Sequence, residues 1–491
     1  MKVLKFKFIP IPILPNLFFL ILTTLLLTSC LDNHRDNLNR ALAENDTVKR
    51  YRIQEIQERG RLVAITDNNT TDYFIFRGTP MGYQFEKLKM FADYLGVDLE
   101  IKLSNNLDEA FRKLDRGDAD LIAMGITVTL NGPGHVAFTE PILQTRQMLV
   151  QRKPENWRKM RNWDEIEQAM VRNPLDLAGK TVYVPKNSPF SNRLKNLSEE
   201  IGQPVYLKEE RDRKTEQLVE AVANGEIAYT VCNEYMALLF ERMYPELDIR
   251  TAISFPQNLA WAVREDSDSL RVTINQWMTE FNKTTASRFL LEKYFSSTRM
   301  AHMAKSEYVS YNQGKISAYD EILRSMARKY HLDWRLVASL IYQESQFNPN
   351  ARSWKGAFGL MQMMPATAAI FGIDTNSTAT EQLEAGIRYI KALDRELPAE
   401  IKDPNERMKF ILASYNVGIA HVYDARRLAE KNGQDPNVWS GNVDYYILNK
   451  SNPAYYRDSV VRYGYARGEE TYNFVIEILD RFEHYKNVIN D

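Results

Sequence analysis

The chain has 491 residues, and a prior of about 150 residues per domain suggests three compact units or two larger ones. Hydrophobic residues make up 44% and charged residues 26%, which is typical of a soluble globular protein and not of a disordered or polytopic one. The 63 basic and 64 acidic residues nearly cancel, so bulk charge gives no reason to expect a nucleic-acid partner. Two cysteines argue against a disulfide scaffold, and six scattered histidines show no metal-ligand spacing, so no metal or other cofactor is expected.

The N-terminus reads as a targeting segment. It begins with lysines at positions 2, 5 and 7, and an apolar stretch follows over residues 8–27. The uninterrupted part of that stretch, 17–27, is shorter than the ~20 residues that a membrane-spanning helix needs. A processed signal is therefore expected in place of a transmembrane helix.

The apolar stretch ends in Leu-Thr-Ser followed by Cys30, which resembles a bacterial lipobox. In such a sequence the signal is cut before the cysteine, and the cysteine is lipidated. We expect a signal peptide over 1–29, a lipid anchor on Cys30 and a polar tether over 30–57, with an ordinary signal peptide and a chance cysteine as the alternative. By the usual sorting pattern, Leu31 after the cysteine favours the outer membrane, with the protein facing the periplasm.

From residue 61 onward, short apolar strands alternate with amphipathic helices. A β-α-β-α-β run of this kind implies a mostly parallel sheet with right-handed crossovers. A second run lies between residues 181 and 233, and closing helices lie between 269 and 295. The strands and helices expected in the first run are 62–66, 83–95, 97–102, 107–114 and 119–124.

Four short blocks in this region resemble family-3 solute-binding proteins, the periplasmic amino-acid receptor class. The resemblance covers roughly residues 58–296 and implies a two-lobed α/β domain with a ligand cleft between the lobes. Lobe 1 would comprise about 61–148 and 248–296, and lobe 2 about 149–247. The blocks that carry the resemblance are residues 82–86, 116–121, 127–141 and 224–228.

Two positions depart from the receptor pattern. Receptors of this class hold the ligand carboxylate with an arginine and the ligand ammonium with an aspartate, and the matching positions here are Gly132 and Asn233. A zwitterion in a desolvated cleft needs an opposite charge at each end. We therefore do not expect a free amino acid to bind in the usual way. The alternatives are a peptide or muropeptide ligand, or a scaffold without a small ligand.

The remainder of the chain divides into a polar stretch, 297–316, expected to be a linker, and a mainly helical domain over 317–491. In one of its helices Val337 and Leu340 belong to an apolar face, and Glu344 follows on the same face. A carboxylate there is either paired or raised in pKa by desolvation. Taken alone, a glutamate at a helix end is more often a solvated surface residue.

The motifs around this glutamate favour a catalytic role. Glu344-Ser345 is followed by Gly-Leu-Met-Gln over 359–362, by Ala-Ser-Tyr-Asn over 413–416 and by Glu-Thr at 470–471. In this order and spacing the combination is highly specific, and it resembles the catalytic domain of soluble lytic transglycosylases, which is related in fold to goose-type lysozyme. With the receptor-like module in front, nearly all of the mature chain is similar to membrane-bound lytic murein transglycosylases. The partner implied is the glycan strand of peptidoglycan.

The residue chemistry points the same way. Glycosidases normally use two carboxylates, but these motifs offer one conspicuous candidate, Glu344. One is enough if the substrate supplies the nucleophile, because the C6 hydroxyl of N-acetylmuramic acid can attack its own C1 and form a 1,6-anhydro sugar. Glu344 would act first as general acid and then as base, which needs an apolar setting. Met361, Met363 and Met364 are candidates for that setting, with ordinary core packing as the alternative.

The resemblance also implies groove residues. Ser353 is expected near the sugar ring, Met361 and Gln362 in the groove, and Tyr415 beside the catalytic carboxylate or the substrate. Phe474 stands where the family usually has a tyrosine, so the hydroxyl at that position is lost. An aromatic-rich stretch is expected to stack sugars in part and to pack the core in part: Trp439, Tyr445, Tyr446, Tyr455, Tyr456, Tyr463 and Tyr465.

The leading hypothesis is therefore a periplasmic, lipid-anchored enzyme that cleaves the β-1,4 bond between N-acetylmuramic acid and N-acetylglucosamine without water. A cell-wall sensor is the first alternative, in which the first module detects muropeptides and the helical domain only binds glycan. A hydrolytic lysozyme is the second, and its products would differ by one water.

Overall fold

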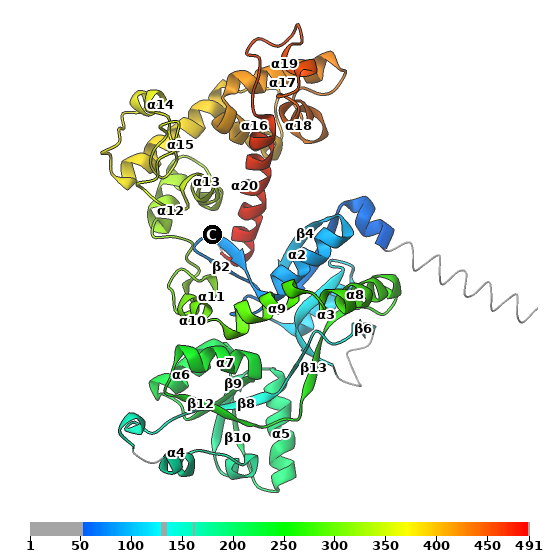
Figure 1. The fold of residues 1–491 in the computed structure, drawn as a ribbon, viewed down its shortest axis with the longest axis vertical. Coiled ribbons are helices and arrows are strands. Elements are labelled where there is room, and N and C mark those ends of the chain that lie inside the picture. The colour runs from blue at the N-terminus through cyan, green and yellow to red at the C-terminus, as the bar shows by residue number, and fades with distance from the viewer. Residues whose placement is uncertain (1–52, 129–134, 161–162, 490–491) are drawn as a thin grey trace, which may run out of the picture.

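The structure is a computed structural model that describes residues 53–128, 135–160 and 163–489. A helical domain, a first α/β lobe and a second α/β lobe follow one another along its long axis (Figure 1). The expected signal peptide, the lipidation of Cys30 and the Gly132 position lie outside these residues. None of the helices in the described ranges is both long and apolar enough to cross a membrane.

The first lobe is built on a sheet with strand order β4-β1-β5-β13-β6, and β7 lies beside β13. β1 pairs in parallel with β4 and β5, as the alternating pattern predicts, because the crossover helices α2 (Tyr83–Leu95) and α3 (Leu107–Asp115) return the chain to the same edge. β13 enters antiparallel to β5. The strands are β1 (Arg61–Thr66), β4 (Asp98–Leu103), β5 (Leu121–Thr127), β6 (Val136–Phe138), β7 (Leu143–Thr145) and β13 (Gln257–Arg264).

The second lobe has strand order β10-β9-β11-β8-β12. β12 pairs antiparallel with β8, so the second lobe extends beyond residue 248, where the sequence places the return to lobe 1. Pairing decides the boundary here, and pairing is not visible in a local pattern. The strands are β8 (Gln147–Arg152), β9 (Thr181–Pro185), β10 (Tyr206–Glu210), β11 (Tyr229–Asn233) and β12 (Leu247–Ala252). The helices are η1 (Trp157–Lys159), α4 (Trp163–Ala169), η2 (Pro174–Leu177), α5 (Pro189–Ile201), α6 (Thr215–Asn224) and α7 (Glu234–Met243).

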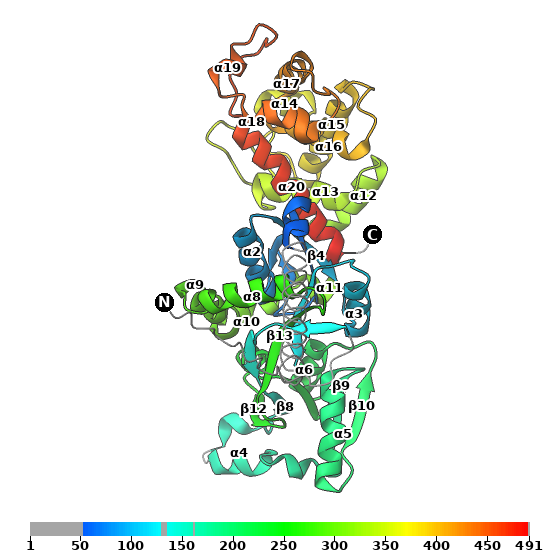
Figure 2. The same cartoon turned by 90° about the vertical axis from the view of Figure 1, so that its right-hand side faces the viewer.

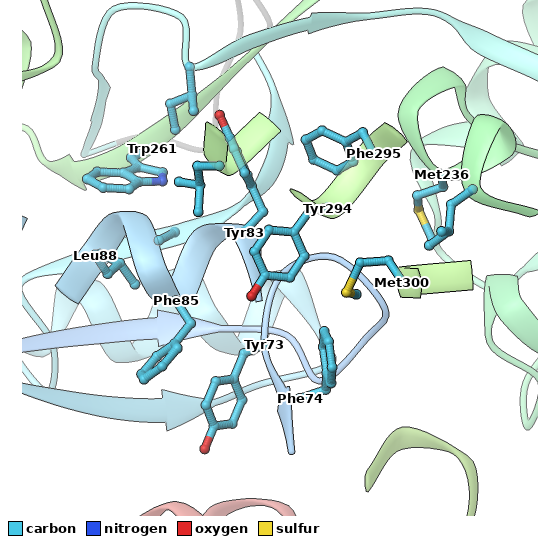
Figure 3. Close-up of a cluster of buried hydrophobic side chains, with 14 of the residues drawn as sticks. Tyr73, Phe74, Tyr83, Phe85, Leu88, Met236, Trp261, Tyr294, Phe295 and Met300 are labelled. Carbon is cyan, nitrogen blue, oxygen red and sulfur yellow. The ribbon is translucent and has the colours of Figure 1, made fainter. Parts of the chain in front are cut away.

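After α8 (Asp268–Phe281) and α9 (Thr285–Leu291), the expected polar linker is in fact a packed segment. It follows η3 (Glu292–Ser296) and contains α10 (Thr298–Ala304) and α11 (Ser310–Gln313). Met300 of α10 is 3% exposed, and Val309, just before α11, is 0% exposed. A few apolar residues are enough to bury one face of helices as short as these. Figure 3 shows Phe295 and Met300 in one apolar cluster with Tyr83 of lobe 1 and Met236 of lobe 2.

The helical domain packs around α13 and the long last helix, α20. The core includes Val337 and Ile341 of α13, Phe410 of α16 and Phe474 of α20. The helices are α12 (Asp320–Lys329), α13 (Trp334–Ser345), α14 (Pro365–Ile370), α15 (Ala379–Glu396), α16 (Pro404–Val417), α17 (Ile419–Lys431), η4 (Trp439–Val443), α18 (Asp444–Leu448), α19 (Pro453–Tyr456) and α20 (Gly468–Val488).

The helical domain is docked on lobe 1 through the end of α20, which reaches that lobe (Figure 2). The hairpin of β2 (Phe74–Phe76) and β3 (Thr79–Met81) also contacts α20. The Tyr485 hydroxyl donates to the carbonyl of Gly78 at 2.9 Å, and Thr79 shares a hydrogen bond of 2.8 Å with the hydroxyl of Tyr342 on α13. Gly78 has φ 85°, and a Cβ there would lie 2.6 Å from both tyrosine side chains. The helix that carries Glu344 is therefore braced directly by the first lobe.

Candidate active site

Glu344 lies in the last turn of α13, where the helix ends abruptly. After Ser345, the last residue of α13, Gln346 and Phe347 have φ values of 50° and 63°. Two consecutive non-glycine residues therefore adopt the left-handed region. Such backbone is costly and persists where the surrounding structure holds it. The strained turn sends the chain away from the helix axis immediately after the acid.

The environment of Glu344 makes it a proton donor near neutral pH. Burial raises its pKa from 4.5 to about 8 and is the sole cause of the shift. No hydrogen bond to this carboxyl group is found within the described ranges, so nothing there offsets the cost of ionising it. Burial, and after it the charge of Glu344, raises the pKa of Tyr415, which places the two side chains within electrostatic reach.

Hydrogen bonds bring three of the motifs together beside Glu344. The Ser345 hydroxyl donates to the carbonyl of Leu360 at 2.7 Å, which fixes the end of α13 against the Gly-Leu-Met-Gln segment. The Tyr415 hydroxyl of α16 donates to the carbonyl of Met361 at 2.6 Å. The segment is thus held from both sides, and the acid lies where the two attachments meet.

The last motif joins the same network. The Thr471 hydroxyl of α20 donates to the side-chain oxygen of Asn416 at 2.8 Å, which links α20 to α16. Phe474 is 6% exposed and belongs to the core of the domain. The hydroxyl that the family pattern would place there is absent, and the ring packs as part of the core.

The loop before the Gly-Leu-Met-Gln segment is braced by its own polar side chains. The Ser353 hydroxyl accepts from the backbone of Ala357 at 3.0 Å. The amide nitrogen of Gln362 donates to the carbonyls of Ala351 and Gly359 at 3.0 and 2.9 Å. Ser353 and Gln362 therefore shape the loop, and their remaining hydroxyl proton and amide oxygen are the groups they can offer a glycan.

The three methionines do not act as one apolar wall. Met361 is 1% exposed, and its sulfur packs against Gly386 of α15, where a Cβ would come within 2.0 Å of it. Its carbonyl accepts from Tyr415 and its side chain packs as core, which is the alternative that the sequence left open; a substrate contact of Met361 stays a prediction. Met363 is 3% exposed and packs as core, whereas Met364 is 45% exposed.

The aromatic-rich stretch contains both buried and exposed rings, as expected if part of it packs in the core. Trp439 and Tyr446 are buried, while three other rings are 47–59% exposed: Tyr445, Tyr463 and Tyr465.

Two aromatic residues were missed by sequence reasoning. Tyr389 of α15 packs against Tyr415 with ring centroids 5.1 Å apart. Its helix carries a regular apolar stripe, which gave no separate signal. Trp354, at the tip of the loop, is 84% exposed, and its signal was a large apolar residue within a glycine-rich polar segment.

In the receptor-like module, the Asn233 amide donates to the hydroxyl of Tyr235 at 3.2 Å. That hydroxyl would lie 2.9 Å from a Cβ at Gly125 of β5. Asn233, which stands where the receptor pattern has a ligand-binding aspartate, is therefore bonded to a neighbouring side chain that reaches across to the first lobe.

The fold and the site define a lysozyme-like glycan-cleaving domain with a desolvated glutamate, joined to a two-lobed module of the binding-protein type. Residues 321–438 match the family model described as transglycosylase SLT domain, and residues 62–297 match bacterial extracellular solute-binding proteins, family 3.

Full-length relatives combine both parts. The chain is 34% identical to membrane-bound lytic murein transglycosylase F of Desulfosudis oleivorans over 88% of this chain and 91% of the relative. It is 33% identical to the protein of the same name in Saccharophagus degradans, over 87% and 82% of the two chains. The chain belongs to the membrane-bound lytic murein transglycosylase F family. Among solved structures, a variant of ArgBP from T. maritima is 25% identical, with a TM-score of 0.41, and covers 50% of this chain and 99% of its own.

Proposed function

We propose that this chain is a lytic murein transglycosylase that cleaves the β-1,4 bond between N-acetylmuramic acid and N-acetylglucosamine and leaves a 1,6-anhydro end. The observation that carries the proposal is the Glu344 carboxyl group, which is desolvated, has a pKa of about 8 and lacks a polar partner among the described residues. A group of this kind both gives and takes a proton close to neutral pH.

The step balances with this one carboxyl group. Protonated Glu344 gives its proton to the glycosidic oxygen as the bond from C1 to that oxygen breaks. The C6 hydroxyl of the same muramic acid then bonds to C1 and returns its proton to Glu344, which ends as it began. A two-carboxylate glycosidase needs a second acid about 5–9.5 Å from the first, whereas this step uses Glu344 alone.

Product mass tests the proposal. Purified peptidoglycan digested by the wild-type chain should release anhydro-muropeptides, and Glu344→Gln should release none. Products heavier by one water would identify a hydrolytic lysozyme instead. A wild-type chain that binds peptidoglycan and releases nothing would leave only the sensor.

For localisation, we propose that Cys30 carries a lipid that anchors the chain to the outer membrane on the periplasmic side. The lipobox-like residues before it and Leu31 after it support this placement, as do relatives named membrane-bound. Cys30→Ala should abolish incorporation of labelled palmitate and release the chain from the membrane fraction. An anchored Cys30→Ala chain would contradict the lipid anchor. A muropeptide or peptide ligand for the first module stays a prediction.

A further inference from the structure

A large cavity lies where the catalytic domain meets the first lobe. Three parts of the chain line it: the β2–β3 hairpin, the segment from α9 to α10, and the end of α13, the helix of Glu344. Its volume is about 1110 Å³, whereas a site for a small ligand typically has roughly 300–1,000 Å³. The cavity is therefore large enough for an extended ligand of several units.

Basic side chains outnumber acidic ones along the cavity. Arg77, Lys293 and Arg299 line it, against one carboxylate, that of Glu292. Lys293 already pairs with Glu86 of α2 at 2.6 Å. Both arginines are exposed, and in the described part of the chain neither has a carboxylate within ion-pair distance. Two guanidinium groups are thus available to the carboxylates of a ligand, which guanidinium binds through paired hydrogen bonds.

Arg77 occupies a backbone position that is costly for an arginine. With Gly78 it forms the two-residue turn between β2 and β3, and the two φ values are 46° and 85°. Asparagine followed by glycine is the preferred pair in such a turn. The backbone of Arg77 donates to the carbonyl of Tyr308 at 3.1 Å, and its guanidinium lies 5.5 Å from the ring of Phe76. A ligand carboxylate would account for an arginine at a position where asparagine folds better.

The cavity also offers apolar surface. Met300, which belongs to the apolar cluster of Figure 3, lines it, and so does Phe289, which is 74% exposed. A free phosphate or sulfate would use the arginines alone. A ligand that combines carboxylates with apolar groups would use the whole lining, and an acidic peptide has this composition.

The cavity reaches around the end of the helix that carries the catalytic acid. A smaller cavity of about 210 Å³ shares Arg77 and Gln346 with it and is also lined by Phe347, in the turn that follows α13. Tyr342 and Gln346 stand two positions before and after Glu344, about 200° around the helix, so the acid lies on the opposite side. A helix with its side chains is roughly 10–12 Å wide. An extended peptide of four residues spans roughly 13 Å and can bridge that width.

We propose that this cavity binds the acidic peptide attached to muramic acid in the glycan strand being cut. The peptide leaves the sugar at Glu344, passes the end of α13 and places its carboxylates at Arg77 and Arg299, with its methyl groups against Met300. The site is separate from the cleft between the two lobes. This inference rests on the proposed function, and it gives the enzyme a means to select strands that carry peptides.

Strand binding to the full chain in detergent tests the site apart from catalysis. In a Glu344→Gln background, fluorescently labelled strands that carry peptides should bind about tenfold tighter than the same strands stripped by an amidase, as measured by anisotropy. Peptide-bearing strands whose carboxylates have been amidated should bind like the stripped ones. Arg77→Asn together with Arg299→Met should abolish the preference. Because asparagine suits the turn, Arg77→Asn alone should weaken the preference without lowering Tm.

Arg116→Asn is the matched control, since Arg116 is an exposed arginine of the first lobe that does not line the cavity. It should leave the preference intact. Equal binding of peptide-bearing and stripped strands would overturn the proposal. So would a preference that survives the double substitution, because the peptide would then be bound elsewhere, or one that survives amidation. A wild-type chain that shows the arginine-dependent preference yet releases no anhydro-muropeptides would instead refute the proposed function and leave this site standing.

Discussion

At the boundary between the two lobes, Lys214 and Glu216 each bond to the opposite lobe, whereas in the catalytic domain the half-buried carboxyl group of Glu344 has no hydrogen-bond partner among the described residues. Burial raises the pKa of both Glu216 and Glu344. The partners of Glu216 hold its side chain in place, whereas the carboxyl group of Glu344 is available for proton transfer. The difference assigns architecture to the first region and chemistry to the second.

Removing the acid should give the largest effect. Glu344→Gln keeps the shape of the side chain and abolishes proton transfer, so kcat should fall by about a thousandfold. Release of anhydro-muropeptides from purified peptidoglycan measures it. Glu216→Gln, at the start of α6 on the boundary between the lobes, should change kcat by less than about twofold. Comparable losses in the two variants would remove the distinction between the regions.

Tyr415 tests whether the groove needs its hydrogen-bonded frame. Tyr415→Phe deletes the donor to the buried carbonyl of Met361, and an unsatisfied carbonyl costs about 1–3 kcal/mol. We expect kcat to fall about tenfold with little change in KM, because the residue positions the segment and does not hold the glycan. Tyr389→Phe keeps the ring packing and serves as control. A pure rise in KM would make Tyr415 a substrate contact instead.

The sequence predicts the elements that depend on local signals. The bounds of α2 agree with the expected 83–95, and α3 extends only one residue beyond the expected 107–114. Strong periodicity marks both helices, and Gly96 closes α2 in the left-handed conformation. The assignment of β12 and the expected linker were wrong. β12 pairs with β8, and the residues expected to form a linker pack against both lobes. These contacts join parts of the chain that are far apart in sequence, so a local pattern does not reveal them.

The site shows the same division. Motif order and spacing predict Glu344 and Tyr415 as site residues, and the structure brings the two side chains within electrostatic reach. The packing of Met361 could not be predicted, because it depends on Gly386, a residue on another helix whose missing side chain makes the room. The Asn233 position was noticed, but its bond to Tyr235, which contacts Gly125 of the other lobe, depends on how the lobes are placed.

The raised pKa of Glu344 should also appear in stability. A carboxyl group with a pKa of about 8 in the folded chain, against 4.5 as its ordinary value, holds its proton more tightly when folded. Its contribution to the free energy of unfolding is therefore full below about pH 4.5 and is lost as the pH rises toward 8.

Glu344→Gln removes that loss. The variant should exceed the wild type by about 1–2 kcal/mol near pH 9, after allowance for solvent screening of a partly exposed group, and match it near pH 4. Urea unfolding at the two pH values measures the difference. Glu477→Gln, on the exposed face of α20, should show no such pH dependence. An equal difference at both pH values would mean that packing, not ionisation, is responsible.

The smallest effect is expected at an exposed aromatic residue of the catalytic domain. The turn that carries Trp354 is closed by a 3.0 Å hydrogen bond from Gly356 to the carbonyl of Ser353, and the Lys355 ammonium lies 5.2 Å from the indole. An indole that is exposed to solvent on a hydrogen-bonded turn can stack on a sugar ring. Trp354→Ala should therefore raise KM for long glycan strands about threefold to tenfold without changing kcat. Phe255, 87% exposed between β12 and β13, is the matched residue of the other region, and Phe255→Ala should leave KM unchanged. If both substitutions raise KM equally, the glycan contacts the lobes as well as the groove, and the separation of architecture from chemistry fails at the surface.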